Sequence, residues 1–249
     1  MTLVGLDASI LGPAFLTGLV VLSTHVPLGE RVLQRGIVFL DLAVAQLAAA
    51  GAIAGHLLLP EDSWAEPLAP LAAALAGSYA LYRCERRWPA LQEAIIGVAF
   101  VVTASAVLLM LAKTPHGGEH LNDVLAGQIL WVQWEQLGIA AGLSALILTI
   151  WGWRARHGPL PQGLFYALFA LSVTVSVQLV GVYLVFASLI LPAIVARHAG
   201  LPAGFAVGGM GYALGLLASG LFDLPAGPAV VCALAATAAV AGALRRVSG

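Results

Sequence analysis

Charged residues are scarce in this chain, and their scarcity excludes a soluble globular protein. They make up 9% of the 249 residues, whereas a soluble domain carries roughly a quarter, so too few charges remain to cover a surface that faces water. Hydrophobic residues make up 61% of the chain, and no stretch fits a soluble domain. The composition therefore predicts an integral membrane protein with a single transmembrane domain over residues 1–249.

Several kinds of chemical site are also missing. The two cysteines, Cys84 and Cys232, supply neither a disulfide framework nor the spacing of a metal site. The net charge of -1 argues against a basic surface for nucleic acid. The Lys113-Thr114 pair lacks the preceding glycine-rich loop that cradles phosphates. We therefore expect no nucleic-acid partner, and any nucleotide chemistry must come from another subunit.

Polar breaks divide the sequence into apolar segments of about 20 residues, the length that a helix needs to cross the hydrocarbon core of a bilayer. We predict about nine crossings and hence an all-α membrane protein. The predicted segments are residues 10–27, 37–59, 68–82, 91–111, 136–153, 163–178, 181–196, 202–221 and 228–244. No basic region or small-residue cleavage site accompanies the first segment, so we expect it to stay in the membrane.

The ten arginines predict the orientation of the chain, because arginines in short loops face the cytoplasm. They fall at alternate ends of the predicted segments: Arg31, Arg35, Arg83, Arg86, Arg87, Arg154, Arg156, Arg197, Arg245 and Arg246. All ten can share one side only if the apolar stretch 163–196 crosses twice, with a tight turn near residues 178–181. This pattern predicts the N-terminus outside the cell and the C-terminus inside.

Small residues recur at a spacing that lets helices approach closely in lipid. Pairs of glycines four residues apart occur at Gly51/Gly55, Gly138/Gly142, Gly204/Gly208 and Gly211/Gly215. We expect these pairs to pack helices within the chain rather than to form a dedicated dimer face. Residues 121–134 are only partly apolar and end in Trp131 and Trp134, which predicts a re-entrant or interfacial piece instead of a crossing.

Asp41 is the one ionisable residue that is well placed inside a predicted crossing. An unpaired charge is costly there, so the residue is a functional-site hypothesis. The same segment contains Gln46, and polar residues alternate in the sixth segment at Ser172, Thr174, Ser176 and Gln178. Alternate positions do not share one helix face, so we expect some of these side chains only to bond backbone carbonyls.

A polar loop between two crossings contains the pattern H-x-x-E-H at His116, Glu119 and His120, followed by Asp123. Inverted zincins use this pattern on a helix to bind zinc and activate water. A proline and two glycines interrupt a helix here, which disfavours the catalytic interpretation. Imidazole and carboxylate are nevertheless good ligands for zinc or manganese. The loop is therefore either an ordinary solvated loop or an entrance that attracts a passing divalent cation.

Two stretches resemble a known family. Residues 177–197, VQLVGVYLVFASLILPAIVAR, resemble a signature of the permeases of zinc/manganese ABC importers. Residues 223–231, DLPAGPAVV, resemble the segment before that family's last helix, and weaker matches at residues 27–29, 35–36, 93–97 and 125–130 extend the resemblance over nearly the whole chain. The resemblance implies a type II ABC importer permease bundle in a bacterial-type inner membrane. It also implies a homodimer with cytoplasmic ABC ATPase subunits and an extracytoplasmic metal-binding protein.

The resemblance also suggests roles for particular residues. Family members commonly carry a histidine in the second crossing, where Gln46 stands in this chain. An amide is a poorer zinc ligand than imidazole, which leaves Asp41 as a ligand candidate. The connection after Pro192 would seat a coupling helix in a cleft of the ATPase. The residues expected to make this contact are Arg197, His198, Gly200, Leu201 and Pro202.

The expected function is the transmembrane subunit of an ATP-driven importer of a divalent transition metal, zinc or manganese, without a permanently bound cofactor. The metal would enter past His116, Glu119, His120 and Asp123 and then pass Asp41 and Gln46. One alternative is a permease of the same fold that carries a chelated metal or a siderophore. Two others are an intramembrane zinc metallopeptidase built on His116, Glu119 and His120, and a secondary transporter that needs no ATPase.

Overall fold

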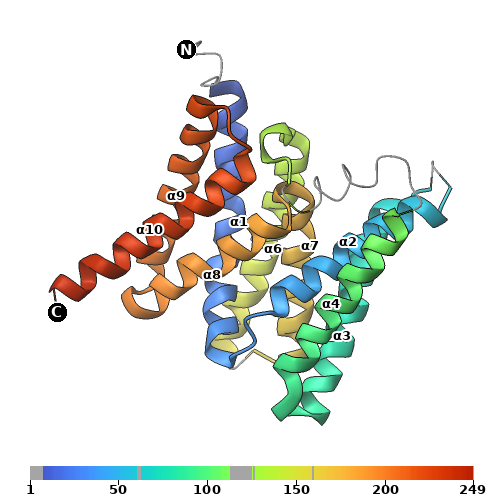
Figure 1. Ribbon diagram of the computed structural model, residues 1–249. Coiled ribbons are helices and arrows are strands. Elements are labelled where there is room, and N and C mark those ends of the chain that lie inside the picture. Colours follow the sequence, from blue (N-terminus) through green and yellow to red (C-terminus); the bar gives the residue numbers. More distant parts are fainter. Residues whose placement is uncertain (1–7, 61–62, 113–124, 126, 159, 249) are drawn as a thin grey trace.

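The computed structural model describes residues 8–60, 63–112, 125, 127–158 and 160–248, and all regular structure in these residues is helical (Figure 1). The long helices are α1 (Ala8–Arg35), α2 (Leu40–Leu58), α3 (Ala69–Arg87), α4 (Gln92–Leu111), α6 (Trp134–His157), α7 (Gln162–Val180), α8 (Val182–Ala199), α9 (Leu201–Phe222) and α10 (Ala226–Ser248). Short 3-10 turns lie at Glu66–Leu68 (η2), Pro89–Leu91 (η3) and Ile129–Trp131 (η4). Each predicted crossing corresponds to one of the long helices.

Within the described residues, eight helices are long and apolar enough to cross a membrane. The remaining long helix, α3, has 19 residues, which is also enough for a crossing, but four of its last five residues are charged. The prediction of an all-α membrane protein is therefore confirmed. The charged residues at the end of α3 are the reason that this helix is less apolar than the other eight.

Helix α1 is longer than the sequence predicted. The predicted crossing ended at Pro27, but the helix continues through this proline to Arg35. Proline removes one backbone hydrogen bond from a helix, yet Leu28 and Val32 beyond it are almost fully buried. Burial of these side chains outweighs the local cost. The helix therefore continues about two turns beyond the predicted crossing, and His25 lies inside it.

Gly181 separates α7 from α8, which confirms that the apolar stretch 163–196 forms two helices. Its φ of 80° lies in the left-handed region that favours glycine. A second glycine with positive φ, Gly127, approaches the same turn so closely that a Cβ there would collide with the carbonyl of Val180. Successive long helices run in alternating directions along the bundle (Figure 1). The turn at Gly181 preserves that alternation.

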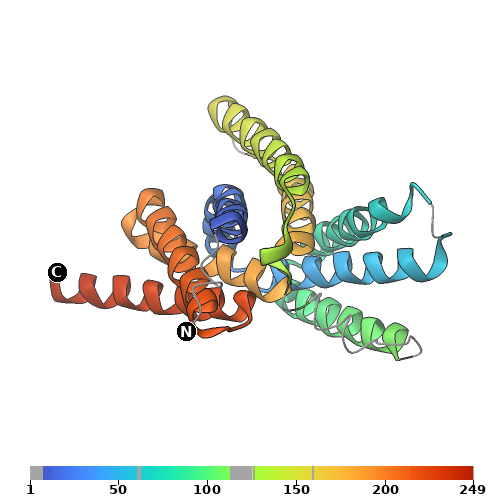
Figure 2. The ribbon, with the colours of Figure 1, turned by 90° about the horizontal axis from the view of Figure 1, so that it is seen from above.

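The bundle is elongated rather than round. Helices α1 and α7 stand in its middle, α2 to α4 form one side, and α8 to α10 form the other (Figure 1). Seen from above, α10 and the α2–α4 group project in opposite directions (Figure 2). The core that joins the two sides contains Leu22 of α1, Leu40 of α2, Phe165 and Phe169 of α7, and Leu189 of α8.

Three of the four glycine pairs pack helices within the chain, as predicted. Added Cβ atoms at Gly51 and Gly55 would meet the start of α3, those at Gly204 and Gly208 would meet α1 and α8, and those at Gly211 and Gly215 would meet α10. Added Cβ atoms at Gly138 and Gly142 would meet nothing within 4 Å. This fourth pair therefore makes no close contact with the helices that the structure describes.

Arginine-bearing helix ends come together at one end of the bundle. The Arg35 guanidinium lies 4.4 Å from the centre of the Phe165 ring, and that of Arg31 lies 5.8 Å from the Trp151 ring. The Arg197 side chain donates a hydrogen bond to the Leu33 carbonyl at 3.0 Å. These contacts join the ends of α1, α6 and α8 to the start of α7. We call this end of the molecule the arginine end.

Candidate functional site

Asp41 lies in the first turn of α2 and is completely buried. It is placed there by the short connection from α1, in which Gly36 adopts a φ of 72°. Neither carboxylate oxygen has a hydrogen-bond partner among the described residues. The N-terminal turn of a helix favours a negative charge, which offsets part of the cost of burial. A buried carboxylate without a partner is unusual and is typical of a site that binds something else.

Gln46 is also buried in α2, with 6% of its surface exposed. Five residues separate it from Asp41, so the two side chains leave the helix in directions that differ by roughly 140°. Ala45, one position earlier, shares the face of Asp41 and is fully buried. Asp41 and Gln46 therefore both lie in the interior, but on different faces of α2.

His25 is a buried polar residue to which the sequence analysis assigned no role. Its side chain in α1 is fully buried, and its Nδ1 lies 3.2 Å from Thr24 Oγ1. Its Nε2 has no hydrogen-bond partner in the part of the chain that the structure describes. A buried imidazole nitrogen of this kind can accept a proton or bind a metal. The sequence signal for its burial was the apolar spacing of Leu28 and Val32, which continues the helix past Pro27.

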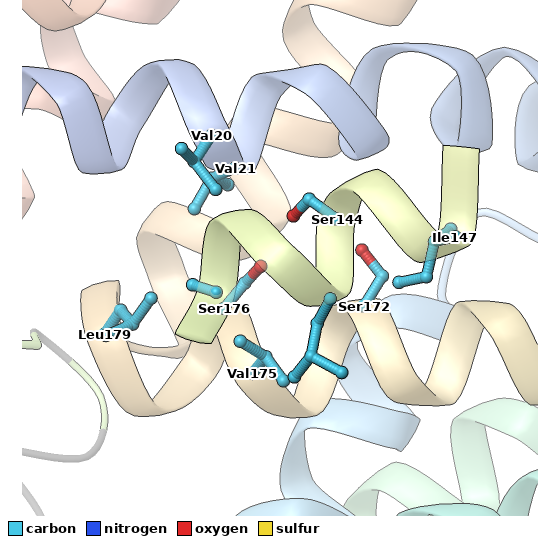
Figure 3. Close-up of a pocket in the computed structure, with 10 residues that line it drawn as sticks. Val20, Val21, Ser144, Ile147, Ser172, Val175, Ser176 and Leu179 are labelled. Carbon is cyan, nitrogen blue, oxygen red and sulfur yellow. The ribbon is translucent and has the colours of Figure 1, made fainter. Parts of the chain in front are cut away.

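Hydroxyl groups connect α1 to α7 next to His25. The Oγ1 of Thr24 and the Oγ of Ser172 lie 2.8 Å apart. Beside this pair, Ser172 and Ser176 of α7 face Ser144 of α6 and Val20 and Val21 of α1 across a small cavity of about 10 Å³ (Figure 3). That volume suits roughly one water molecule. The cavity is too small for a hydrated ion to pass.

The polar residues of α7 spread around the helix, as the sequence analysis expected. Ser172 and Ser176 line the cavity, Thr174 is buried with its hydroxyl unpartnered among the described residues, and Gln178 is exposed. These side chains do not form a continuous polar line along one face of α7.

The residues expected to contact an ATPase lie at the arginine end and are exposed. Arg197 and His198 belong to the last turn of α8, Gly200 is the single residue between the helices, and Leu201 and Pro202 begin α9. The His198 Nδ1 donates to the Ile194 carbonyl at 2.9 Å. Gly200 permits the sharp turn because its φ is 85°. The stretch is a direct helix-to-helix turn, not a loop that contains a separate coupling helix.

A hydrogen-bonded cluster also holds the arginine end together. The Gln92 amide donates to the Tyr166 hydroxyl at 2.7 Å, and the Phe39 backbone N–H donates to Glu93 Oε1 at 3.3 Å. The Tyr82 and Tyr166 rings lie 6.0 Å apart. These contacts tie the end of α3 to the starts of α2, α4 and α7, and Phe39 lies two residues before Asp41.

The predicted entrance residues, His116, Glu119, His120 and Asp123, lie outside the described residues. Among the residues that are described, no group of three or more His, Cys, Asp or Glu side chains could hold a metal ion. At the end of the bundle opposite the arginines, His56 Nδ1 and Glu66 Oε1 lie 3.1 Å apart. In the described interior, Asp41, Gln46 and His25 are therefore buried side chains that could each bind a metal, but they do not form one cluster.

Comparisons with known proteins agree with this architecture. A family model described as the ABC 3 transport family matches residues 7–157 and 160–245. Among curated proteins, none matches the chain significantly.

Two solved structures share the fold. PsaBC from Streptococcus pneumoniae, in complex with Fab, contains a chain that is 20% identical, with a TM-score of 0.75 over 97% of this chain and 95% of that one. An inward-facing structure of a transporter assigned to the metal-chelate type is 18% identical, with a TM-score of 0.70 over 92% of this chain and 84% of that one. At these identities the likeness shows a common fold.

Proposed function

The chain belongs to the ABC 3 transport family, and from this premise we propose that it is the transmembrane subunit of an ATP-driven importer of a divalent transition-metal ion, manganese or zinc. Family membership, together with the eight apolar helices found in the described residues, makes it a multi-pass membrane protein and a transport subunit. ATP hydrolysis belongs to a separate subunit of such transporters. The peptidase alternative built on His116, Glu119 and His120 is therefore not retained.

The observation that carries the proposal is the buried carboxylate of Asp41. A carboxylate that is fully enclosed by protein, without a hydrogen-bond partner among the described residues, destabilises the fold. The cost is explained if a cation binds to the carboxylate during transport. Carboxylate and amide oxygens suit manganese better than zinc, which prefers imidazole and thiolate. Asp41 and Gln46 thus favour manganese as the cargo.

Two copies of the chain, two ATPase subunits and an extracytoplasmic metal-binding protein complete the proposed transporter. Similarity to the PsaBC complex and to a metal-chelate type transporter supports this assembly. In this proposal the metal passes between the two copies, and the small cavity beside Ser172 within one copy suits a single water molecule. In this proposal, His116, Glu119, His120 and Asp123 attract the metal at the entrance.

The arginine end faces the cytoplasm in this proposal, with the N-terminus outside. Arginines concentrate on the cytoplasmic side of membrane proteins, and Arg197 to Pro202 would meet the ATPase there. An epitope tag at the C-terminus should therefore bind antibody in inside-out vesicles and not in intact cells. Binding in intact cells would reverse the orientation.

Transport by the reconstituted complex tests the proposal. The chain is placed in vesicles with its co-purifying ATPase and binding protein, and ATP-dependent accumulation of manganese, zinc and iron is measured side by side. Accumulation of manganese or zinc supports the proposal. Accumulation of metal only when a chelator accompanies it would favour the chelated-metal alternative. Uptake driven by a proton gradient without ATP would favour a secondary transporter.

A further inference from the structure

A groove lies between α8 and α10 where both helices approach the arginine end. Its volume is about 460 Å³, and the side chains that matter for its chemistry are Ile194, Val195 and His198 of α8 and Ala241, Gly242 and Arg245 of α10. Both helices pack against α9 (Figure 1). The C-terminal half of α10 then extends away from the rest of the bundle (Figure 2), which leaves the groove open to its surroundings.

The groove is apolar along its length and basic at one end. Ile194 is 43% exposed although it lies in an apolar helix, so the groove presents hydrocarbon to the bilayer. His198 and Arg245 lie at the ends of α8 and α10, where a membrane-spanning helix reaches the headgroup region. An occupant that fits this arrangement has a hydrocarbon part and an anionic part, in that order along the groove.

Acidic residues are absent from the helices that form and support this groove. The segments of α8, α9 and α10 contain no aspartate or glutamate, and Asp223 at the far end of α9 is the only acidic residue after Glu135. The ends of α8 and α10 carry the basic residues Arg197, His198 and Arg245. This corner is therefore electrically complementary to an anionic partner.

We propose that this groove binds an anionic phospholipid of the surrounding bilayer, with an acyl chain along Ile194 and Ala241 and the phosphate beside His198 and Arg245. Basic pockets between transmembrane helices bind anionic lipid headgroups in this way. A second copy of the chain fits less well, because a symmetric interface places the same surface against itself and would bring basic groups together. The proposal goes beyond metal transport and does not depend on which metal is carried.

The position of the site gives the lipid a role in holding α8 to α10. His198 belongs to the same turn as Arg197, which is tied to α1 through the Leu33 carbonyl. A lipid that bridges α8 and α10 would stabilise the end of α8 that we propose to contact the ATPase. Loss of the lipid should therefore lower the melting temperature of the complex.

The test measures retained lipid on the full chain purified with its ATPase. The complex is reconstituted in nanodiscs of phosphatidylcholine with or without phosphatidylglycerol, and lipid that survives transfer to the gas phase is counted by native mass spectrometry. Arg245→Gln removes the headgroup contact, and Ala241→Phe fills the apolar part of the groove. Arg156→Gln is the matched control, because this arginine lies at the end of α6 and does not line the groove.

The wild-type complex should retain phosphatidylglycerol in preference to phosphatidylcholine and melt at a higher temperature when it is present. Arg245→Gln should weaken retention about fivefold, the effect of one basic residue at a membrane surface. Ala241→Phe should weaken it as well, while Arg156→Gln should not. Equal retention of the two lipids, or an equal loss in Arg156→Gln, would overturn the proposal. A change in self-association with unchanged lipid retention would identify the groove as an interface between copies instead.

Discussion

Replacing Asp41 by alanine should raise the stability of the protein while abolishing transport. Truncation of a well-packed buried side chain to alanine normally destabilises a protein by about 2–5 kcal/mol. Asp41 is different because it is completely buried and its carboxylate has no partner among the described residues. Truncation of a residue that is kept in an unfavourable environment for function should therefore increase the free energy of unfolding, whereas truncation of a residue that only fills space decreases it.

The expected size follows from three contributions. Removing a buried polar group without a partner gains about 1–3 kcal/mol. The cavity left by a carboxylate, roughly 30 Å³ at about 24 cal/mol per Å³, costs less than about 1 kcal/mol. The favourable interaction with the N-terminus of α2, worth about 0.3–1 kcal/mol, is also lost. The balance is a gain of about 1 kcal/mol, which raises the melting temperature by roughly 2–4 °C for a chain of this size.

Thermal unfolding of the purified protein, with and without manganese, provides the assay. The control is Leu40→Ala, because Leu40 is the neighbouring residue in α2 and is equally buried. This variant should lower the melting temperature by more than about 4 °C. Manganese should stabilise the wild type and not Asp41→Ala. A loss of stability in Asp41→Ala as large as in Leu40→Ala would refute the reasoning, because the carboxylate would then have a structural partner.

Three further predictions concern packing, coupling and metal choice. Gly29→Ala should destabilise the protein by about 1–3 kcal/mol, because the new Cβ would collide with the carbonyl of Leu189. A Cβ at Gly12 in the same helix would meet none of the described residues within 4 Å, so Gly12→Ala should be neutral or slightly stabilising in thermal unfolding. Arg197→Glu should reduce either assembly with the ATPase, measured by co-purification, or ATP hydrolysis, measured by phosphate release. Normal values for both would place the coupling contact elsewhere. Gln46→His should increase zinc uptake relative to manganese, since imidazole is the better zinc ligand; an unchanged ratio of the two metals would remove Gln46 from the pathway.

Most of the helices could be predicted from the sequence because apolar length alone decides whether a segment can cross a bilayer. The division of residues 163–196 was harder, since that stretch is apolar throughout. The arginines resolved it, because only two crossings keep Arg156 and Arg197 on the same side. The structure places the break at Gly181, within the predicted turn.

The ends of the helices could not be predicted in the same way. Proline usually marks a helix boundary, but Pro27 lies inside α1, where buried neighbours such as Val32 hold the helix together. The burial of His25 was not predicted for the same reason, since it depends on contacts with other helices that a single sequence does not reveal. The connection after Pro192 was likewise expected to seat a coupling helix, but α8 continues to Ala199 and turns at Gly200 directly into α9.

Asp41 could be identified from the sequence because an acidic residue in an apolar segment stands out. Its complete burial, and the placement of Gln46 on another face of α2, needed the structure. The resemblance to a family of metal permeases predicted the ABC 3 transport family, and the family match confirms it. The lipid groove had no counterpart in the sequence, because its two walls are about 45 residues apart in the chain.

The central claim is that the metal passes the buried carboxylate of Asp41. The most direct test compares the wild type with Asp41→Asn, a variant of nearly the same size, in vesicles that contain the ATPase and the binding protein. Metal accumulation and ATP hydrolysis are measured in the same sample. The account predicts that Asp41→Asn assembles and hydrolyses ATP but accumulates little or no metal. Metal accumulation at the wild-type rate would contradict it.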